Sequence, residues 1–408
     1  MDISLVKQKY DEALKGLASN TTTVFGYDKP VLIEGGAYRG VWLECGPLEG
    51  LVYGRHVRHA LEIAKANHEI FFRLQRGDGY LPCAVRSDRM GTSQIQMVVP
   101  IAATALETAD LTGDEAFLAQ AYESCARWDH WLSRHRNTRG TGLCEAFCEY
   151  DTGHDNSPRF KNLPKKCPDN DASVCPAAGN LPYLAPDLSA SVYGGRRALA
   201  RMADRLGKPR EVQMWLEQAE HMRERIIKHC FDPEDECFYD VDRDGNFVKI
   251  RGDALTRVLG EHVPDQALFD RIYARYIANP QEFWTPYPLP SISVSDPAFI
   301  RELPPNSWGG ASQALTALRA PRWFEYYGRA NDLRHLMNRW VEAILAAPGF
   351  MQQMNPWTGE FSTSEGYSPA MCVFIEFVDR LGIRTAEQSV GTWRRSAPQV
   401  QPGRTGTI

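Results

Sequence analysis

One short segment, Glu149–Arg159, concentrates the residue types that acid–base catalysis requires. It carries the carboxyl groups of Glu149, Asp151 and Asp155, together with a histidine, an amide and an arginine. Hydrolysis of a glycosidic bond needs one carboxylic acid to protonate the departing oxygen, and a second carboxylate to activate water or to attack the sugar. A solvated loop whose Asp and Asn residues cap turns explains the same composition. Spacing alone therefore does not decide between the two interpretations.

A resemblance to a known motif favours the catalytic interpretation. The run Asp151-Thr152-Gly153-His154-Asp155-Asn156-Ser157 is similar to Glu-Ser-Gly-Trp-Asp-Asn/Phe-Ser, in which the Asp is the general acid. That motif belongs to the inverting helical-toroid enzymes of glycoside hydrolase family 63, with mannosylglycerate or glucosylglycerate hydrolase-like and α-glucosidase-like members, and to the related trehalases. The resemblance extends over most of residues 30–383 and implies that Asp155 is the general acid. Similar stretches are Asp187-Leu188, Phe231-Asp232 with Phe238-Tyr239-Asp240, Tyr287–Ser291 and Asn306–Gly310.

The position of the family's general base holds a glutamine. The family segment reads Gly-Phe-x-Glu-x-Tyr-Asn/Asp-Pro-x-Thr-Gly, and residues 349–359 match it with Gln352 at the Glu position. A glutamine cannot accept a proton from water at neutral pH. Three explanations stay open: another carboxylate acts as the base, the chain has lost hydrolysis, or a natural glutamate was replaced deliberately to trap substrate. Glu365, and after it Glu360, lie close enough in the chain to take over, although a helix-dipole role explains Glu365 equally well.

Aromatic and polar residues outside the helical stretches predict the walls of a sugar pocket. The run Gly40–Glu44 resembles the family's Trp-Asp sugar-binding segment, with Glu44 in place of the Asp. Aromatic faces stack on pyranose rings while carboxylates and Arg bind the hydroxyl groups, but a core role explains each Trp equally well. We expect Asp151 and Arg159 to orient the site. The expected substrate-binding residues are Trp42, Glu44, Asp151, His154, Asn156, Arg159, Trp308, Trp357 and Tyr367.

We predict neither a metal nor a cofactor. The run Asp240–Asn246 imitates the start of a calcium loop, but Arg251 stands where the loop requires its final Glu, and a tight turn between two short strands explains the run. The ten cysteines, scattered from Cys45 to Cys372, form no C-x-x-C pair, and no histidine cluster completes a zinc site. We expect them to be reduced thiols.

The overall composition narrows the choice of partner. The 408 residues have a formal net charge of -5, with 43% hydrophobic and 24% charged residues, and neither sign of charge forms runs. A nucleic-acid partner is therefore not expected. The chain contains no apolar run of membrane-spanning length, and its first residues do not resemble a signal peptide. We expect a cytoplasmic protein without membrane contact; self-association into a homo-oligomer stays open.

Long amphipathic stretches must position these residues. Helical periodicity predicts helices over residues 2–18, 55–76, 99–112, 115–137, 187–207, 209–230, 265–278, 308–328, 330–346 and 366–382. Turns near Gly113, Gly207 and Gly328 join successive helices as hairpins, and strands do not alternate with them. We therefore predict an all-α fold, an (α/α)6 toroid or barrel, with long functional loops and short β-hairpins. Residues 1–385 would form one catalytic domain and residues 386–408 a flexible tail.

The resemblance and the site residues together predict an inverting, exo-acting glycoside hydrolase that cleaves a small soluble α-glycoside or disaccharide. Asp155 would be kept protonated by partial burial, about 6.5 to 9.5 Å from the group that activates water. A sugar epimerase or isomerase on the same toroid is one alternative, because the fold does not fix the function. A carbohydrate-binding protein that has lost the base is the other, and Gln352 supports it.

Overall fold

The computed structural model describes residues 2–383, and within this range the chain forms twelve α-helices. Six of them surround the centre: α2 (Gly46–His56), α4 (Ile101–Thr112), α6 (Pro186–Arg205), α8 (Asp253–Gly260), α10 (Ala314–Tyr326) and α12 (Ser368–Arg380). The other six alternate with them along the chain: α1 (Ile3–Ser19), α3 (Leu61–Arg73), α5 (Glu115–His135), α7 (Pro209–Cys230), α9 (Gln266–Ile272) and α11 (Ala330–Ala346). The tail predicted over 386–408 lies outside the described residues.

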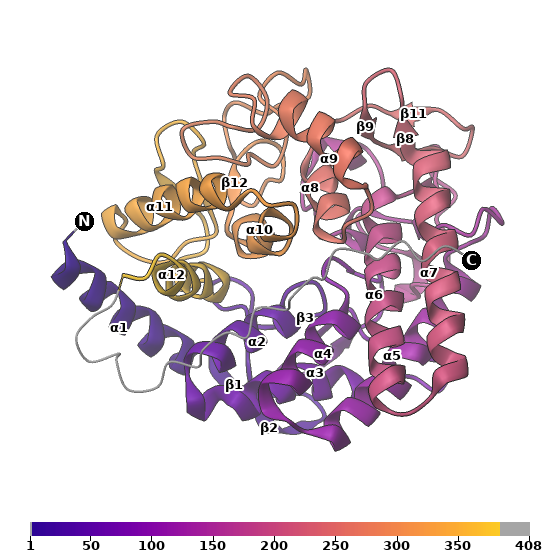
Figure 1. Cartoon of the computed structure of the whole chain (residues 1–408), viewed down its shortest axis with the longest axis horizontal. Helices are drawn as coiled ribbons and strands as arrows, with labels where there is room; N and C mark the ends of the chain where they lie inside the picture. Colours follow the sequence, from indigo (N-terminus) through magenta and orange to yellow (C-terminus); the bar gives the residue numbers. More distant parts are fainter. Residues whose placement is uncertain (1, 384–408) are drawn as a thin grey trace, which may run out of the picture.

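The six inner helices form a closed ring. Each packs against the next along the chain, from α2 through α4, α6, α8 and α10 to α12, and α12 packs against α2 again. Figure 1 looks onto this ring, with α1, α7, α9 and α11 on its outside. This arrangement confirms the predicted (α/α)6 toroid.

The outer helices follow the hydrophobic period that the sequence displays. In α7 the buried residues Trp215, Ala219, Met222 and Ile226 are spaced by four, three and four, so a single stripe faces the ring. The three predicted hairpin turns are confirmed as well. Gly113, Gly207 and Gly328 all have φ near +70°, the left-handed conformation in which a helix commonly ends at glycine.

Two inner helices were not predicted. Helix α2 begins in a segment expected to be irregular, and α8 lies between two predicted helices. Both are short, and nearly all of their residues are buried. Helix α2 is covered all round and has no polar face, so its sequence lacks the periodic alternation on which the prediction rested. The eight residues of α8 are too few to display a helical period over the length that such a prediction needs. Ring closure supplies the burial that stabilises them.

The strands are short, and all pair antiparallel in five small sheets. Their bounds are β1 (Thr21–Val24) with β2 (Tyr27–Leu32); β3 (Gly40–Trp42), β4 (Ala84–Arg86) and β5 (Met90–Gly91); β6 (Glu145–Ala146), β7 (Tyr183–Leu184), β10 (Asp240–Val241) and β11 (Phe247–Val248); β8 (Phe231–Asp232) with β9 (Cys237–Phe238); and β12 (Ser312–Gln313), β13 (Gln353–Met354) and β14 (Phe361–Ser362). Strands β3, β7 and β12 lead almost directly into α2, α6 and α10. The loops between strand and helix therefore gather at the N-terminal end of the inner ring.

Short turns of other helical types complete the described chain. They are η1 (Arg58–Ala60), η2 (Glu149–Asp151), η3 (Pro158–Phe160) and η4 (Pro168–Asn170), and a π-helical turn, η5 (Tyr273–Ile277), which continues α9. None of the helices between residues 2 and 383 combines the length and apolar composition that crossing a membrane requires.

A buried amide ties the first strand pair to the ring. The fully buried Asn67 side chain accepts a hydrogen bond from Leu32 N (2.8 Å) and donates to the carbonyl oxygens of Leu32 (2.9 Å) and Gly46 (2.8 Å). We predict that Asn67→Ala lowers the free energy of unfolding by about 3 kcal/mol, because it leaves buried backbone groups without partners. Urea unfolding measures this loss. The exposed Gln8→Ala should stay within about 0.5 kcal/mol of the parent, and an equally small effect of Asn67→Ala would contradict the prediction.

Candidate active site

Asp155 lies at the N-terminal end of the inner ring, in the loop between η2 and η3. Its backbone oxygen accepts a hydrogen bond from Trp308 N (3.0 Å), and its Oδ2 accepts one from the side-chain amide of Asn306 (3.0 Å). Burial raises the pKa of Asp155, against the opposing effects of Asn306 and Lys165. A carboxyl group with a raised pKa retains its proton at higher pH, which is the property that a general acid needs.

Asp151 fixes the loop that carries Asp155 through hydrogen bonds to other parts of the protein. This side chain is fully buried, and its Oδ1 accepts hydrogen bonds from Ile95 N (2.9 Å) and Arg136 Nη2 (3.0 Å). Its Oδ2 accepts one from Phe147 N (2.7 Å) and one from Arg136 Nη1. Both carboxylate oxygens are directed at protein, which corrects the expectation that Asp151 binds substrate: it fixes the loop instead.

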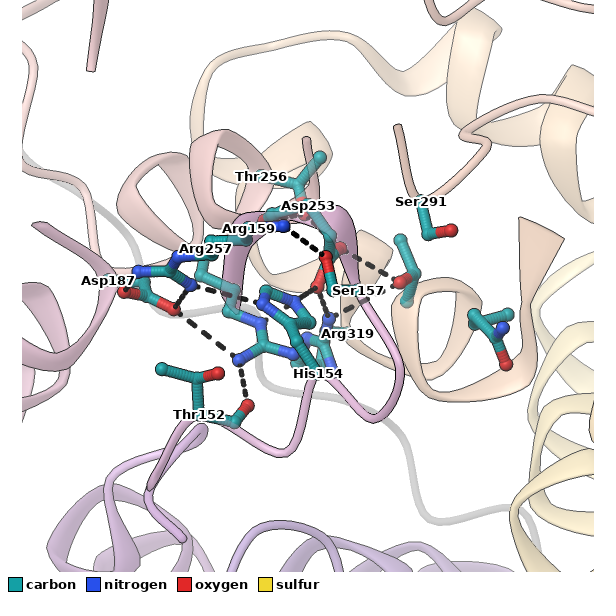
Figure 2. A network of polar contacts seen from close by, with 12 residues as sticks. Thr152, His154, Ser157, Arg159, Asp187, Asp253, Thr256, Arg257, Ser291 and Arg319 are labelled. Atoms are coloured by element: carbon teal, nitrogen blue, oxygen red, sulfur yellow. Dashed lines mark hydrogen bonds and ion pairs between the residues drawn. The ribbon is translucent and has the colours of Figure 1, made fainter. Parts of the chain in front are cut away.

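A buried network of three arginines and three aspartates lies beneath this loop. Figure 2 shows its arginines, Arg159, Arg257 and Arg319, with two of the aspartates, Asp187 and Asp253. Arg159 donates two hydrogen bonds to Asp187 (2.7 and 2.8 Å) and two to Asp240 (2.5 and 2.6 Å). Because every nitrogen of its guanidinium group is bonded and the side chain is buried, Arg159 does not contact substrate either. This corrects its place among the substrate-binding residues, while its expected role of orienting the site fits the geometry.

His154 joins the two halves of the network. Its Nδ1 accepts a hydrogen bond from Arg159 Nη1 (3.0 Å), so the ring proton lies on Nε2, which contacts Asp253 Oδ2 (3.1 Å). Burial lowers the pKa of His154 to about 3, so the ring is neutral at physiological pH. Although burial opposes its ionisation, Arg319 and Arg257 hold the pKa of Asp253 well below its usual range. His154 thus connects the network to the loop that carries its neighbour Asp155, and its hydrogen bonds help to fix the position of that loop.

A second group of carboxyls faces Asp155 from the start of α2. Burial, followed by the charge of Asp155, raises the pKa of Glu44 to about 8. Glu44 packs on Gly153, where a Cβ atom would overlap Glu44 Oε2 and where φ is +64°, so only glycine fits. The pKa of the buried Glu34 is raised by burial and by Glu49 and Glu44, while Tyr367 donates a hydrogen bond to its Oε1 (2.7 Å).

Gln352 also lies close to Asp155, immediately before β13. The hydroxyl of Tyr38 donates to Gln352 Oε1 (2.9 Å), and Gln352 Nε2 donates to Asn306 Oδ1 (2.8 Å). Because Asn306 also donates to Asp155, a single amide bridges Gln352 and Asp155. Through this bridge Gln352 Nε2 and Asp155 Oδ2 lie no more than about 8 Å apart.

Aromatic rings surround these groups. Tyr38 and Trp42 meet edge to face with their ring centroids 5.9 Å apart, and Trp308 lies against His154 at 4.9 Å. Tyr38 also borders Tyr367, with the centroids 5.9 Å apart. The expected residues Trp42, Glu44, His154, Trp308 and Tyr367 are therefore brought together around Asp155 and Gln352, although the buried Tyr367 hydroxyl is engaged by Glu34.

Other expected residues lie farther from Asp155. Glu365 is exposed and packs on Gly349, and the exposed Glu360 lines a separate surface depression with Arg301. Trp357 is 39% exposed and meets Phe299 edge to face. No contact joins either glutamate to Asp155 or Gln352 within residues 2–383. The structure therefore offers no geometric support for Glu360 or Glu365 as the base.

Asn156 is also exposed, and it ties neighbouring loops together. Its side chain donates to Asn306 O (2.7 Å) and accepts a hydrogen bond from Lys165 Nζ (2.7 Å). Together with the bond between Trp308 N and Asp155 O, this contact aligns residues 306–308 with residues 155–156.

Two groups of residues have the ligand types that metals prefer. The ligand atoms of Glu34, Glu44 and Cys45 lie within 4.8 Å of one another, as do those of Cys148, Asp151 and Cys167. Because Arg136 already neutralises Asp151, the second group has no need of a cation. In the first group burial raises the pKa values of Glu34 and Glu44, which favours their neutral forms, and the acid–base arrangement described above does not require a metal.

Three residues of the site were not predicted: Glu34, Tyr38 and Asn306. Asn306 begins a stretch that resembles the family, so its position carried a signal, although no role was assigned to it. Glu34 and Tyr38 lie on either side of the glycine pair at positions 35 and 36, a composition typical of a turn. Their contacts with Tyr367 and Gln352 join residues more than 300 positions apart, which the local pattern does not encode.

The ring of helix pairs and the acidic group at its N-terminal end define a glycoside hydrolase of the helical-toroid class. Residues 52–368 match the mannosylglycerate hydrolase MGH1-like glycoside hydrolase domain. The chain belongs to this family.

Solved structures support the fold assignment. The GH63 mannosylglycerate hydrolase from Thermus thermophilus, in complex with glucose, superposes with a TM-score of 0.71 at 18% identity over 90% of this chain and 99% of that one. The neutral trehalase of Saccharomyces cerevisiae gives a TM-score of 0.67 at 14% identity over 88% of this chain and 74% of that one. An uncharacterized protein of Borreliella burgdorferi is 26% identical over 124 residues, and this match covers 30% of this chain and 26% of the relative's own length.

The pairing of Asp151 with Arg136 gives a prediction for stability. We expect Asp151→Asn to lower the free energy of unfolding by about 3 to 5 kcal/mol, because it leaves the buried Arg136 without its counter-charge. Denaturant unfolding followed by circular dichroism measures the loss. The exposed pair of Glu220 and Arg223 provides the control, since Glu220→Gln should change stability by less than about 1 kcal/mol. Equal effects of the two substitutions would contradict the role assigned to Asp151.

Proposed function

We propose that this chain is an inverting, exo-acting hydrolase of a small soluble α-glycoside, with Asp155 as the general acid. The observation that carries this proposal is the placement of Asp155, which is partly buried, has a raised pKa and faces Gln352 across Asn306. The upper bound of about 8 Å on this separation is compatible with the roughly 6.5 to 9.5 Å between the two catalytic groups of inverting enzymes, a spacing that leaves room for a water molecule.

The hydrogen bonds of Asp155 determine which of its oxygen atoms carries the proton. Its Oδ2 accepts the hydrogen bond from Asn306, so the proton resides on Oδ1, the oxygen that would meet the departing glycosidic oxygen. Transfer of this proton leaves a carboxylate that the amide of Asn306 stabilises.

The surroundings of Asp155 support a small sugar as the substrate. Trp42, Trp308 and Tyr38 provide aromatic faces, and Glu44 provides a carboxyl group that can donate or accept hydrogen bonds near neutral pH. The similar structures carry the names mannosylglycerate hydrolase and trehalase, which supports a substrate of one or two sugar-sized units. The ten cysteines are all free thiols, which supports the proposed cytoplasmic location.

A panel of small α-linked glucosides and mannosides tests the proposal. Proton NMR should detect a released sugar that appears first as the β-anomer. Asp155→Asn should lower kcat by about 100-fold or more, because an amide cannot donate the required proton. Asp244→Asn, in an exposed turn, should leave kcat unchanged. Release of the α-anomer would exclude inversion, and full activity of Asp155→Asn would exclude Asp155 as the acid.

The pH profile gives a second prediction. Since Asp155 must be protonated to act, kcat/KM should fall as pH rises through its raised pKa. Lys165 lowers this pKa, so Lys165→Gln should raise it and move the alkaline limb to higher pH. The exposed neighbour Lys166 provides the matched control, Lys166→Gln. The shift should shrink at high salt, because the charge of Lys165 is exposed to solvent. A shift to lower pH would contradict the assignment of the limb to Asp155.

A further inference from the structure

The base position of this site holds an amide that is hydrogen-bonded, through one intermediate residue, to the acid. Gln352 donates from Nε2 to Asn306 Oδ1 (2.8 Å), and Asn306 donates from Nδ2 to Asp155 Oδ2 (3.0 Å). The two hydrogen bonds point in the same direction, from Gln352 toward Asp155. A side-chain amide has an acceptor oxygen and a donor nitrogen, so it can gain a proton at one atom while it loses one from the other.

We propose that Gln352 and Asn306 form a proton relay that replaces the missing carboxylate base and returns the proton of the attacking water to Asp155. This inference rests on the proposed function of the site. It names the group that accepts the proton of the water, and it accounts for a hydrolase of this family with glutamine at the base position.

Each proton in the relay has a donor and an acceptor. The water oxygen bonds to the anomeric carbon as the glycosidic C–O bond breaks, and Asp155 Oδ1 gives its proton to the leaving oxygen. Asp155 Oδ2 takes a proton from Asn306 Nδ2, Asn306 Oδ1 takes one from Gln352 Nε2, and Gln352 Oε1 takes one from the water. Asp155 is again protonated, and both amides end as neutral imidic acids that revert by proton exchange with solvent water.

The geometry holds Gln352 in the orientation that the relay needs. Tyr38 donates to Oε1, which directs the oxygen away from Asn306 and leaves a second lone pair of Oε1 available to water. The backbone of Gln352 is fixed on both sides, because its N donates to Thr363 O (2.9 Å) and its O accepts from Ala314 N (3.0 Å). Gln352 is buried, so bulk water does not compete for these hydrogen bonds.

Asn306 is held equally firmly. Its backbone oxygen accepts the hydrogen bond from Asn156, and its φ of +49° is one that asparagine adopts more readily than most residues.

The relay also avoids the electrostatic cost of a negative charge at position 352. A carboxylate at position 352 would place a negative charge beside Glu34, Glu44 and Asp155, whose raised pKa values show that these surroundings disfavour ionised carboxyl groups. The amides transfer the proton without any change in their own charge.

The test compares Asn306→Gly in two backgrounds, the parent chain and Gln352→Glu. Glycine keeps the backbone conformation at φ of +49° and removes the amide. In the parent chain Asn306→Gly should lower kcat by about 100-fold or more, because both the relay and a contact of the acid are lost. In Gln352→Glu, where a carboxylate accepts the proton itself, the same substitution should cost less than about fivefold. Equal losses in the two backgrounds would overturn the relay and leave Asn306 as a residue that only positions Asp155.

The pH profile supplies a readout that a structural role would not change. The parent chain should show only the alkaline limb of Asp155, because an amide does not titrate, whereas Gln352→Glu should gain an acidic limb and become bell-shaped. Rates in mixtures of light and heavy water should depend on several transferred protons in the parent chain and on fewer in Gln352→Glu. Cleavage by Gln352→Glu alone would overturn the relay but support the proposed function, and cleavage by neither protein would refute the proposed function itself.

Discussion

The arrangement of the site depends on the buried pairing of Arg159 with Asp187 and Asp240. Burying an unpaired charge costs several kcal/mol, so these groups are stable only when their partners meet with good geometry. Asp187 lies in the first turn of α6 and Asp253 in that of α8, where helix N-termini favour negative charge. The network thereby joins neighbouring inner helices and, through His154, the loop of Asp155. Replacing any member would leave an uncompensated charge beneath the site.

Two chemical environments lie on either side of this network. Below Asp155, arginines keep Asp187 and Asp253 ionised, as their lowered pKa values indicate. On the other side, no arginine between residues 2 and 383 is hydrogen-bonded to Glu34 or Glu44, and burial raises both pKa values. Asp155 lies at the boundary, close enough to the network to be fixed in place but not bonded to its guanidinium groups. This boundary explains how carboxyl groups close together at one end of the ring can have pKa values shifted in opposite directions.

Part of this organisation could be predicted from the sequence. The outer helices and the glycine turns were predicted because they depend on local periodicity and backbone conformation, and Asp155 was assigned through its motif. Helix α2 was missed because burial on all sides removes the amphipathic signal, and α8 because its eight residues are too few to display a helical period. Asp151 and Arg159 were placed among the substrate contacts because composition does not distinguish a charge that faces a pocket from one paired behind it. The contact between Tyr38 and Gln352 depends on the closed ring and has no local signature.

The closure of the ring by α12 against α2 has a consequence for the order of events during folding. Tyr38 and Gln352 are 314 residues apart in the chain, and Glu34 and Tyr367 are 333 apart. Contacts of such high sequence separation form late, because the entropy of closing a long loop must first be offset. During synthesis the segment with Asp155 leaves the ribosome long before α12 does, so a nascent chain contains the acid but not the complete site. Completion of the site therefore waits for the synthesis of α12.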